Sequence, residues 1–309
     1  RQRYRIVTMP ACSGGPTLVE MLHVLEGFDL AASGHNTIAT LHLLAETMRR
    51  AYVDRFAHMA DPDATPVPIA GLTARAYADA RRATIDPLRA DLHPAPGDPW
   101  AFEGRAAERG ENASPVPPPD ATCTTHLCVV DRERRMVTLT NTLGELFGSR
   151  VVVPGTGILL NDGMVWFDPR PGTPNALQPG RRPLNNMAPT LVLRDGRPFL
   201  AVGAPGGRKI LTGVLQTLLN VVDFGLGVQA AVGAPRIHSE GPETYVDSRL
   251  PAEVQEGLRR RGQRVVPLEE TFAATNFSRV VGILVDEANG VLRGGVHLWQ
   301  PATAVGLDG

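Results

Sequence analysis

The sequence has little cysteine and almost no net charge. Its 309 residues include three cysteines, Cys12, Cys123 and Cys128, an odd number without the spacing of a metal site, so neither a disulfide framework nor a zinc site is predicted. Lysine and arginine number 31 against 32 aspartates and glutamates, which gives no field that would attract nucleic acid or an anionic membrane. We therefore predict a small-molecule ligand, with no cofactor and no metal.

Long apolar runs are also missing. No stretch approaches the roughly 20 apolar residues of a membrane-spanning helix, and the opening RQRYRIVTMP lacks the apolar core of a signal peptide. The chain starts at Arg1 without an initiator methionine, and Tyr4 to Met9 already has the pattern of a strand, so we expect a fragment of a longer product. This N-terminus leaves the compartment open between the cytoplasm and a periplasmic or secreted location.

The residues that are present predict a helical layer first. Hydrophobic residues make up 43% of the chain, enough for one large domain or two modest ones. Apolar spacings of three and four predict helices over 13–28, 35–59 and 71–85, the last capped by Thr73. From Asp86 to Ala121 the composition shifts to proline, glycine, alanine and charge, which predicts a mobile connector.

Beyond this connector the pattern is that of strands. Alternation predicts several strands and a hairpin with Asp195 and Gly196 at its tip, and a strongly apolar segment predicts a helix between layers. A further helix and three strands follow, and the expected antiparallel runs of strands with helices outside them favour an α+β layered sandwich. The expected segments are 126–131, 136–142, 189–204, 208–227, 252–262, 263–268, 279–286 and 290–299.

The junction 120–130, DATCTTHLCVV, joins the proline-rich segment to a strand. If the Cys123–Thr124 bond is cut, Thr124 carries a β-hydroxyl beside a free α-amine with a pKa of about 8, so that one residue supplies nucleophile and base. The same hydroxyl is able to make the cut by attacking the Cys123 carbonyl. The alternative is that Thr124 and Thr125 are ordinary β-branched residues that open a strand.

Two further features favour the chemical interpretation. Thr142 lies on the next predicted strand, where a hairpin would return its hydroxyl beside Thr124. Gly206 and Gly207 lie between a predicted strand and a predicted helix, so their backbone N–H groups are placed to point at a developing oxyanion. A tight strand-to-helix turn without chemistry explains the glycine pair equally well.

Together these segments resemble the γ-glutamyltranspeptidase family. The resemblance rests on TTHLCVVD, on Thr142 eighteen residues after Thr124, and on GTGILLND, RRPLNNMAPT, GAPGG and GAPRIH in this order. It implies the four-layer αββα fold of the N-terminal nucleophile hydrolases, autocatalytic processing, and transfer of a γ-glutamyl group from glutathione-like donors to water or an amino acid. Residues 1–123 then correspond to the end of a large subunit and residues 124–309 to a small subunit of one heterodimer, so that the chain is part of a full precursor.

The resemblance also assigns roles to single residues. Thr124 becomes the nucleophile, Thr142 its supporting hydroxyl, and Gly206 with Gly207 the oxyanion hole. Cys123 is the residue released by the cut. The arginine that clamps the substrate carboxylate belongs to a part of the large subunit upstream of this chain.

Two pairs of adjacent residues are expected to contact the substrate or to lie beside it. Asn185 and Asn186 stand where the family has a serine pair that contacts the substrate carboxylate, and their amides still donate hydrogen bonds. Gly144 stands where family members often carry a hydrogen-bond donor such as asparagine, and Glu145 beside it is a candidate substrate contact.

The departure from the family that bears most on the substrate class is at Trp166. It stands where the family usually has an acidic residue for the α-amino group of the glutamyl moiety, and an indole offers a cation only the face of its ring. This resembles the cephalosporin-acylase-like branch, which accepts glutaryl-type acyl groups, so an acylase is the alternative function. Asp162 and Asp168 are candidate substitutes for the acid, although a turn residue and a loop residue are the simpler interpretations.

Two side chains near the junction invite a chemical role but fit a structural one. His126 follows Thr124 by two residues, and we expect a polar core histidine as readily as a catalytic one. Cys128 is expected to be buried packing. A third alternative for the whole chain is an inactive precursor piece that needs a partner to bury its exposed faces.

Overall fold

A five-stranded antiparallel sheet forms the centre of the protein. The computed structural model describes residues 3–104 and 123–306, and the strands lie in the order β1-β4-β5-β9-β10 with antiparallel neighbours. The β4–β5 hairpin turns at Asp195 and Gly196 with φ of +52° and +79°, which confirms the predicted tip because a type I′ turn needs two positive φ values. The strands are β1 (Tyr4–Thr8), β4 (Thr190–Arg194), β5 (Arg197–Gly203), β9 (Val281–Asp286) and β10 (Val291–Val296).

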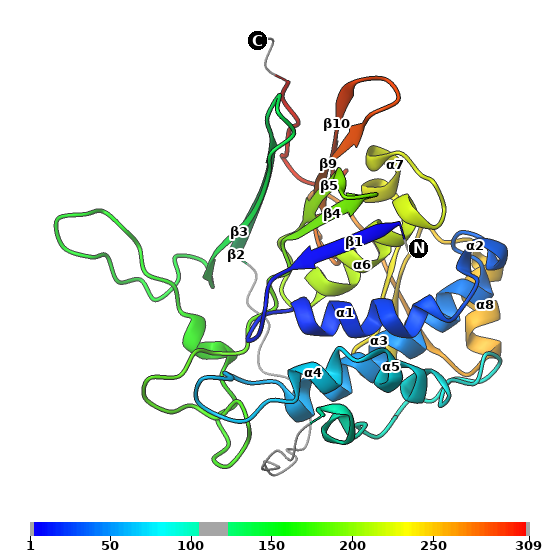
Figure 1. Ribbon diagram of the computed structural model, residues 1–309, viewed down its shortest axis with the longest axis horizontal. Coiled ribbons are helices and arrows are strands. Elements are labelled where there is room, and N and C mark those ends of the chain that lie inside the picture. The colour runs from blue at the N-terminus through cyan, green and yellow to red at the C-terminus, as the bar shows by residue number, and fades with distance from the viewer. Residues whose placement is uncertain (1–2, 105–122, 307–309) are drawn as a thin grey trace.

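Helices cover one face of this sheet (Figure 1). The helix α1 (Gly15–Glu26) packs against α3 (Ile38–His58) and α6 (Lys209–Val222), and α6 lies on β5. Twelve of the 14 residues of α6 are buried, which confirms the predicted helix between layers. No helix among the described residues has the length and apolarity needed to cross a membrane. The shorter helices are α2 (Leu30–Ser33), α4 (Ile69–Leu72), α5 (Arg75–Arg82), α7 (Val228–Gly233) and α8 (Ala252–Arg260), with 3₁₀ turns η1 (Pro99–Phe102) and η2 (Gly163–Trp166).

The strand pair β2 (Cys123–Val130) and β3 (Met136–Gly144) lies on the other face of the sheet (Figure 1). Its inner face is polar and contacts the sheet, where Thr138 Oγ1 donates to the Val202 carbonyl at 3.3 Å. The helices, the five-stranded sheet and the β2–β3 pair therefore stack as three successive layers, which correspond to one helical layer and the two sheet layers of the predicted sandwich. The outer face of the pair carries apolar side chains that are 43–55% exposed, namely Leu127, Val129, Val137 and Leu139.

A smaller sheet lies beside α3 and α8. It contains β6 (Ile237–His238), β7 (Glu243–Asp247) and β8 (Arg264–Leu268). β7 and β8 pair in parallel, whereas the sequence predicts antiparallel runs. The helix α8 connects them, because a parallel pair needs a crossover rather than a tight turn.

The regions before and after Thr124 share one core. β1 of the first region pairs with β4 of the second, and one apolar cluster draws its members from both regions. A buried network crosses the same boundary: Arg49 pairs with Glu46 at 2.6 Å and donates to Gln263 at 2.9 Å. A cut before Thr124 would therefore leave two pieces held together by buried contacts.

The predicted mobile connector is wrong for residues 86–104. The Ala90 N–H donates to the Arg261 carbonyl at 2.7 Å, and the Glu103 carboxylate accepts from the Gly71 N–H at 2.7 Å. Composition misled here because these backbone groups find partners on distant elements rather than local ones. Residues 105–121 of the predicted connector lie outside the described residues.

The predicted capping role of Thr73 is also wrong. α5 begins after Ala74 without a side-chain cap. The Thr73 hydroxyl instead donates to the Ile69 carbonyl at 2.7 Å, at the C-terminal end of α4. A threonine can bond back to a carbonyl four residues earlier as readily as it caps the next helix.

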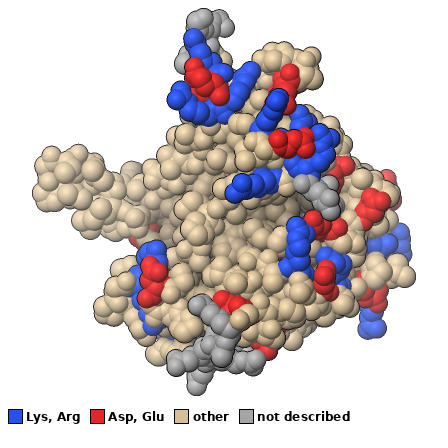
Figure 2. Space-filling model, in the orientation of Figure 1, with Lys and Arg blue, Asp and Glu red and all other residues tan. Residues whose placement is uncertain are grey.

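The segment after β3 forms an arm that extends away from the body, at the left of Figure 1. Two backbone hydrogen bonds of 2.9 Å, from Leu160 to Val151 and from Val153 to Ile158, hold it as a ribbon. Its residues 151–160 include no charged side chain, and Figure 2 shows neither blue nor red on this projection. The arm is therefore an exposed and largely apolar surface.

Candidate active site

The hydroxyl groups of Thr124 and Thr142 meet on the inner face of the β2–β3 pair. The antiparallel register places Thr142 opposite Thr124, and their Oγ1 atoms are 2.8 Å apart. The predicted return of Thr142 beside Thr124 is therefore confirmed, and their chemical roles stay predictions. The register shifts between Cys123 and Thr124, where Leu143 is the extra residue on β3, so that the strand ladder is locally disrupted at the bond before Thr124.

A chain of hydrogen bonds links both hydroxyls to the peptide bond before Thr124. Thr142 Oγ1 accepts from the Gly144 N–H at 3.0 Å and donates to the Cys123 carbonyl at 3.2 Å. A hydroxyl has only one proton to donate, so the Thr124 hydroxyl is the donor in its contact with Thr142. The Thr142 hydroxyl thus polarises the carbonyl group next to the Thr124 oxygen.

His126 and Cys128 follow Thr124 on the same face and are packed as neutral groups. Burial lowers the pKa of His126 to about 4, and its ring nitrogens contact the hydroxyls of Thr140 and Thr138 at 2.8 and 2.9 Å. Burial raises the pKa of the Cys128 thiol to about 11. Neither side chain is charged at neutral pH, which fits the structural roles expected for both.

His126 gives a prediction for stability as a function of pH. Burial lowers its folded pKa to about 4, while the unfolded chain has a pKa of about 6.5 and binds more protons between these values. Its contribution is therefore full above about pH 6.5 and falls by up to about 3 kcal/mol as the pH drops toward 4. We expect the free energy of unfolding of wild type minus that of His126→Gln, from urea titrations, to decrease over this range. A difference that is constant with pH would contradict the burial argument.

Gly206 and Gly207 form the turn between β5 and α6. Their φ angles are +136° and +57°, values that favour glycine. A Cβ on Gly206 would lie 2.7 Å from the Ser278 Cα atom, so position 206 is packed too closely for a side chain. The predicted strand-to-helix turn is confirmed, and its oxyanion role stays a prediction.

The glycine turn and the threonine pair lie at the same part of the sheet. The His126 ring lies against Gly203, where a Cβ would come within 2.1 Å of the ring. Gly203 ends β5 three residues before Gly206, and Thr124 precedes His126 by two residues on the same face of β2. At about 3.3 Å per extended residue, both features lie within about 10 Å of the His126–Gly203 contact.

The start of α6 is fixed by buried charge. Arg208, directly after the glycine pair, binds Glu240 at 2.7 Å, and its carbonyl accepts a hydrogen bond from the Tyr52 hydroxyl. Burial alone would raise the pKa of Glu240, but hydrogen bonds and charge from His238 and Arg208 outweigh it and lower the pKa to about 2. Glu240 is therefore ionised at neutral pH and anchors the helix that follows the turn.

Asn185 and Asn186 lie in a loop held by Arg55. The Arg55 guanidinium donates to the Asn185 carbonyl and, at 3.1 Å, to Asn186 Oδ1. The Asn185 amide donates to the Cys12 carbonyl at 3.1 Å, and its Oδ1 accepts from the Met187 N–H at 3.1 Å. The Asn185 side chain thus ties the loop to the segment around Cys12, and the substrate roles of both asparagines stay predictions.

Trp166 and Glu145 lie in different surroundings. The Trp166 side chain is only 9% exposed, and its ring lies 3.2 Å from the position of a Cβ on Gly163. Glu145 is exposed, and its backbone N–H donates to the Asp162 carboxylate at 3.0 Å. The indole is thus packed within its loop, whereas Glu145 leaves its own carboxylate to solvent and brings Asp162 toward the end of β3.

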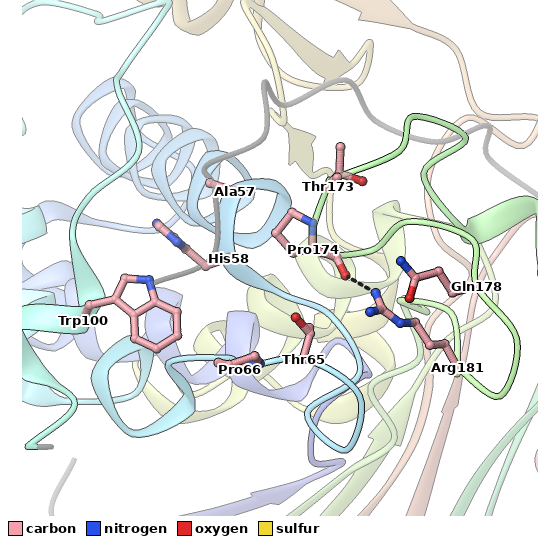
Figure 3. A pocket seen from close by; sticks show the side chains of 10 residues that line it. Ala57, His58, Thr65, Pro66, Trp100, Thr173, Pro174, Gln178 and Arg181 are labelled. Atoms are coloured by element: carbon pink, nitrogen blue, oxygen red, sulfur yellow. Dashed lines mark hydrogen bonds between the residues drawn. The ribbon is translucent and has the colours of Figure 1, made fainter. Parts of the chain in front are cut away.

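A cavity of about 150 Å³ lies elsewhere, between the end of α3, η1 and the loop that follows η2 (Figure 3). It is smaller than the usual range of about 300–1,000 Å³ for ligand sites, and Arg181 in its wall donates to the Pro174 carbonyl at 3.3 Å. None of the site residues predicted from the sequence lines it, so we assign it no function. Its lining is Ala57, His58, Thr65, Pro66, Trp100, Gly172, Thr173, Pro174, Gln178 and Arg181.

Sequence reasoning missed three residues that hold the site in place. Arg55 lies in AYVDRFAHM, within the helix predicted over residues 35–59. Ser278 and Glu240 have no local pattern and act only through contacts made by the fold. In the part of the chain that the structure describes, no group of three or more His, Cys, Asp or Glu side chains is placed to hold a metal.

Sequence comparisons agree with this geometry. The sequence model of the γ-glutamyltranspeptidase family matches residues 1–307. A glutathione hydrolase proenzyme of Bacillus subtilis subsp. natto is 34% identical over 309 residues, which cover 99% of this chain and 52% of the relative. The Acylase ACY 1 proenzyme of Pseudomonas sp. (strain SE83) is 37% identical over 257 residues, which cover 83% of this chain and 43% of the relative. The chain thus spans about half the length of these curated relatives.

Solved structures agree as well. The crystal structure of cephalosporin acylase from Bacillus halodurans matches 100% of this chain and 52% of that chain, with a TM-score of 0.84 and 29% identity. This likeness confirms the predicted α+β class and the N-terminal nucleophile hydrolase fold.

Proposed function

The chain belongs to the γ-glutamyltranspeptidase family, and from this premise we propose that it carries the nucleophile of an enzyme that cuts itself before Thr124 and then transfers acyl groups through that threonine. The proposed donor is a γ-glutamyl compound of the glutathione type, and the acceptor is water or an amino acid. The observation that carries the proposal is the 2.8 Å contact between the Thr124 and Thr142 hydroxyls beside a bulge at the bond to be cut.

In the first reaction the Thr124 hydroxyl attacks the Cys123 carbonyl carbon. A C–O ester bond forms, the C–N peptide bond breaks, and the hydroxyl proton ends on the nitrogen that becomes the α-amine of Thr124. The Thr142 hydroxyl, 3.2 Å from the Cys123 carbonyl oxygen, stabilises the negative charge that develops there. Water then hydrolyses the ester, which releases the Cys123 carboxyl group and restores the Thr124 hydroxyl.

In the second reaction Thr124 acts as nucleophile and base. Its α-amine, with a pKa of about 8, takes the hydroxyl proton while Oγ1 attacks the carbonyl carbon of the donor, and gives it to the departing amine as the C–N bond breaks. An acyl ester on Thr124 remains. Water or an amino-acid amine attacks this ester, passes a proton back through the α-amine, and frees the acyl product and the threonine.

The Gly206–Gly207 turn is the proposed oxyanion hole. Backbone N–H groups at the start of a helix have no helical partner and lie at the positive end of its dipole, and α6 begins directly after this turn at Lys209. Fixed donors stabilise a developing oxyanion because they need no reorganisation during the reaction. The close approach of Ser278 to Gly206 keeps the turn from relaxing.

A glutaryl acylase is the second candidate function. Trp166 at the position of the acidic residue favours it, and so does the likeness to a cephalosporin acylase. A glutaryl group has the chain length of a γ-glutamyl group but no α-amine, so the two candidates differ in one positive charge on the donor.

The first test is to sequence the N-termini of the complete protein after incubation at neutral pH and to assay its activity on anilide donors. We expect a new terminus reading Thr124-Thr125-His126 and release of p-nitroaniline from γ-glutamyl-p-nitroanilide, because the freed amine activates the hydroxyl. A much larger kcat/KM on glutaryl-p-nitroanilide selects the acylase instead. An uncut protein that hydrolyses neither anilide contradicts the proposal.

A third candidate is an inactive piece that awaits a partner. The exposed outer face of the β2–β3 pair, with Val129 and Val137 at 52% and 55% exposure, favours it because soluble proteins rarely leave such patches uncovered. In the same experiment this candidate predicts an uncut chain that elutes as aggregates or obligate pairs in size-exclusion chromatography.

A further inference from the structure

We propose that Arg236 is a positioning residue that aims and polarises the Gly206 N–H of the oxyanion hole through two backbone peptide groups. The inference rests on the proposed function, because it assumes that this N–H stabilises the oxyanion formed when Thr124 attacks a donor. Arg236 lies in the segment GAPRIH, which takes no part in the two proposed reactions. Its side chain acts through the backbone of residues 278–279 and 205–206.

Arg236 is a buried cation between α7 and β6. Its side chain is 4% exposed, and burial lowers its pKa to about 10, although the carboxylates of Glu270 and Asp247 favour the charged form. The guanidinium is therefore charged at neutral pH. It donates to the Val232 carbonyl and, at 3.4 Å, to the Ser278 carbonyl. A buried charge costs free energy that a neutral donor would not, which favours a role for the charge itself.

The first peptide group of this relay joins Ser278 to Arg279. Its carbonyl accepts from Arg236 at 3.4 Å, and its N–H donates to the Pro205 carbonyl at 3.1 Å. In a planar trans peptide the C=O and N–H bonds point in opposite directions, so one peptide group can bond the cation on one side and a carbonyl on the other. The positive end of its dipole therefore faces Pro205.

The second peptide group joins Pro205 to Gly206. Its carbonyl is held by the Arg279 N–H, so its own N–H is aimed away from that segment. Within residues 3–104 and 123–306, the Gly206 N–H donates to no backbone carbonyl. Hydrogen bonds in a chain polarise one another, and peptide dipoles add head to tail as they do in a helix. The charge of Arg236 therefore strengthens the donor at the far end of the chain.

A carboxylate holds the other end of the segment 276–279. The Glu270 side chain is 5% exposed, and its Oε1 atom accepts from the N–H groups of Asn276 and Phe277. Ser278 follows and packs against Gly206, where a Cβ would lie 2.7 Å from the Ser278 Cα atom. The segment that holds the Pro205 carbonyl is thus fixed from both ends. A donor fixed in this way needs no reorganisation when the oxyanion forms.

The Gly207 N–H is held independently of Arg236. It belongs to the peptide group whose carbonyl, that of Gly206, accepts from the Lys209 N–H at 3.1 Å, in the first turn of α6. A change at Arg236 should therefore weaken one of the two proposed donors and leave the other in place. The expected effect is smaller than the roughly 10²- to 10³-fold loss that follows when an oxyanion donor is removed.

The test is Arg236→Gln in the complete protein, because glutamine removes the charge but keeps an amide donor. On the preferred anilide we expect kcat to fall about 10- to 100-fold and KM to change less than about threefold, since the relay acts on the transition state.

A boronic acid gives a second readout. The analogue 2-amino-4-boronobutanoate, or 4-boronobutanoate for a glutaryl donor, forms a tetrahedral anionic adduct with the Thr124 hydroxyl and so resembles the transition state. Its Ki should rise by the same factor as kcat falls, while the Ki of the matching carboxylate, L-glutamate or glutarate, stays within about threefold. A merely structural role would move both inhibition constants together.

Arg82→Gln is the matched control. The Arg82 guanidinium also donates to two backbone carbonyls, those of Val24 and His23, each at 2.7 Å. It lies on α5, which packs on α1 rather than on the glycine turn. This variant should lose stability but keep kcat and both inhibition constants. An equal loss of kcat in both variants would trace the effect to general destabilisation and overturn the inference.

The remaining outcomes separate the inference from the proposed function. An unchanged kcat in folded Arg236→Gln, or equal losses of affinity for boronate and carboxylate, overturns the inference alone. A wild type that neither cuts itself nor turns over either anilide overturns both.

If Arg236→Gln fails to fold or to cut itself, the crystal structure of the wild-type boronate adduct decides. An adduct oxygen should lie within about 3.2 Å of the Gly206 nitrogen, with the Arg236–Ser278 and Arg279–Pro205 hydrogen bonds both kept. An adduct that does not contact the Gly206 N–H, or that forms with either bond broken, overturns the inference.

Discussion

Replacing Thr124 by alanine is expected to leave the complete protein uncut at the Cys123–Thr124 bond and to lower kcat by at least about 10⁴-fold. The Thr124 hydroxyl supplies the attacking oxygen in both proposed reactions. Thr142 cannot take its place, because its hydroxyl already donates to the Cys123 carbonyl and accepts from the Gly144 N–H. Intact mass spectrometry measures the cut, and p-nitroaniline release measures turnover.

Two variants on the same strand serve as controls. Thr125 is exposed and pairs with Asn141 on the opposite face of β2, so Thr125→Ala should cut itself and turn over like wild type. Thr124→Ser keeps a hydroxyl and should still cut. A Thr124→Ala protein that yields a terminus at residue 124 would show that another agent makes the cut.

The second large effect is expected at the glycine turn. Gly206→Ala should lower kcat on the preferred anilide by about 10²- to 10³-fold, the usual result of losing an oxyanion donor. The new Cβ would lie 2.7 Å from the Ser278 Cα atom and 2.9 Å from its Cβ atom, and the φ of +136° is unfavourable for alanine. The turn therefore has to move, and its N–H groups move with it. KM should change less than kcat, because the donors act mainly in the transition state.

Gly196→Ala separates this effect from general backbone strain. Gly196 has a positive φ of +79°, but a Cβ there meets no atom within 4 Å. We expect a loss of stability of about 1 kcal/mol with kcat unchanged. Equal losses of kcat in both glycine variants, measured below their melting temperatures, would argue against an oxyanion hole at Gly206.

Local chemistry explains which parts of the site are predictable. The Thr124–Thr142 meeting follows from two alternating segments and a short turn, because a hairpin fixes its own register. The Asp195–Gly196 tip follows from the φ values that only such residues adopt easily. The prediction of a mobile connector failed for residues 86–104 for the converse reason. Their hydrogen-bond partners, such as Arg261 for Ala90, are far away in the sequence.

The sequence by itself determined the α+β class, the strand that begins at the junction, and the identities of a threonine pair and a glycine turn. Only the tertiary structure decided that the turn lies beside the strand pair, through His126 on Gly203, and that the Asp162 carboxylate fills the space beside Gly144. The physical reason is the range of the forces involved. Periodicity and turn chemistry act over a few residues, whereas the position of a carboxylate depends on packing between segments that only the folded chain brings together.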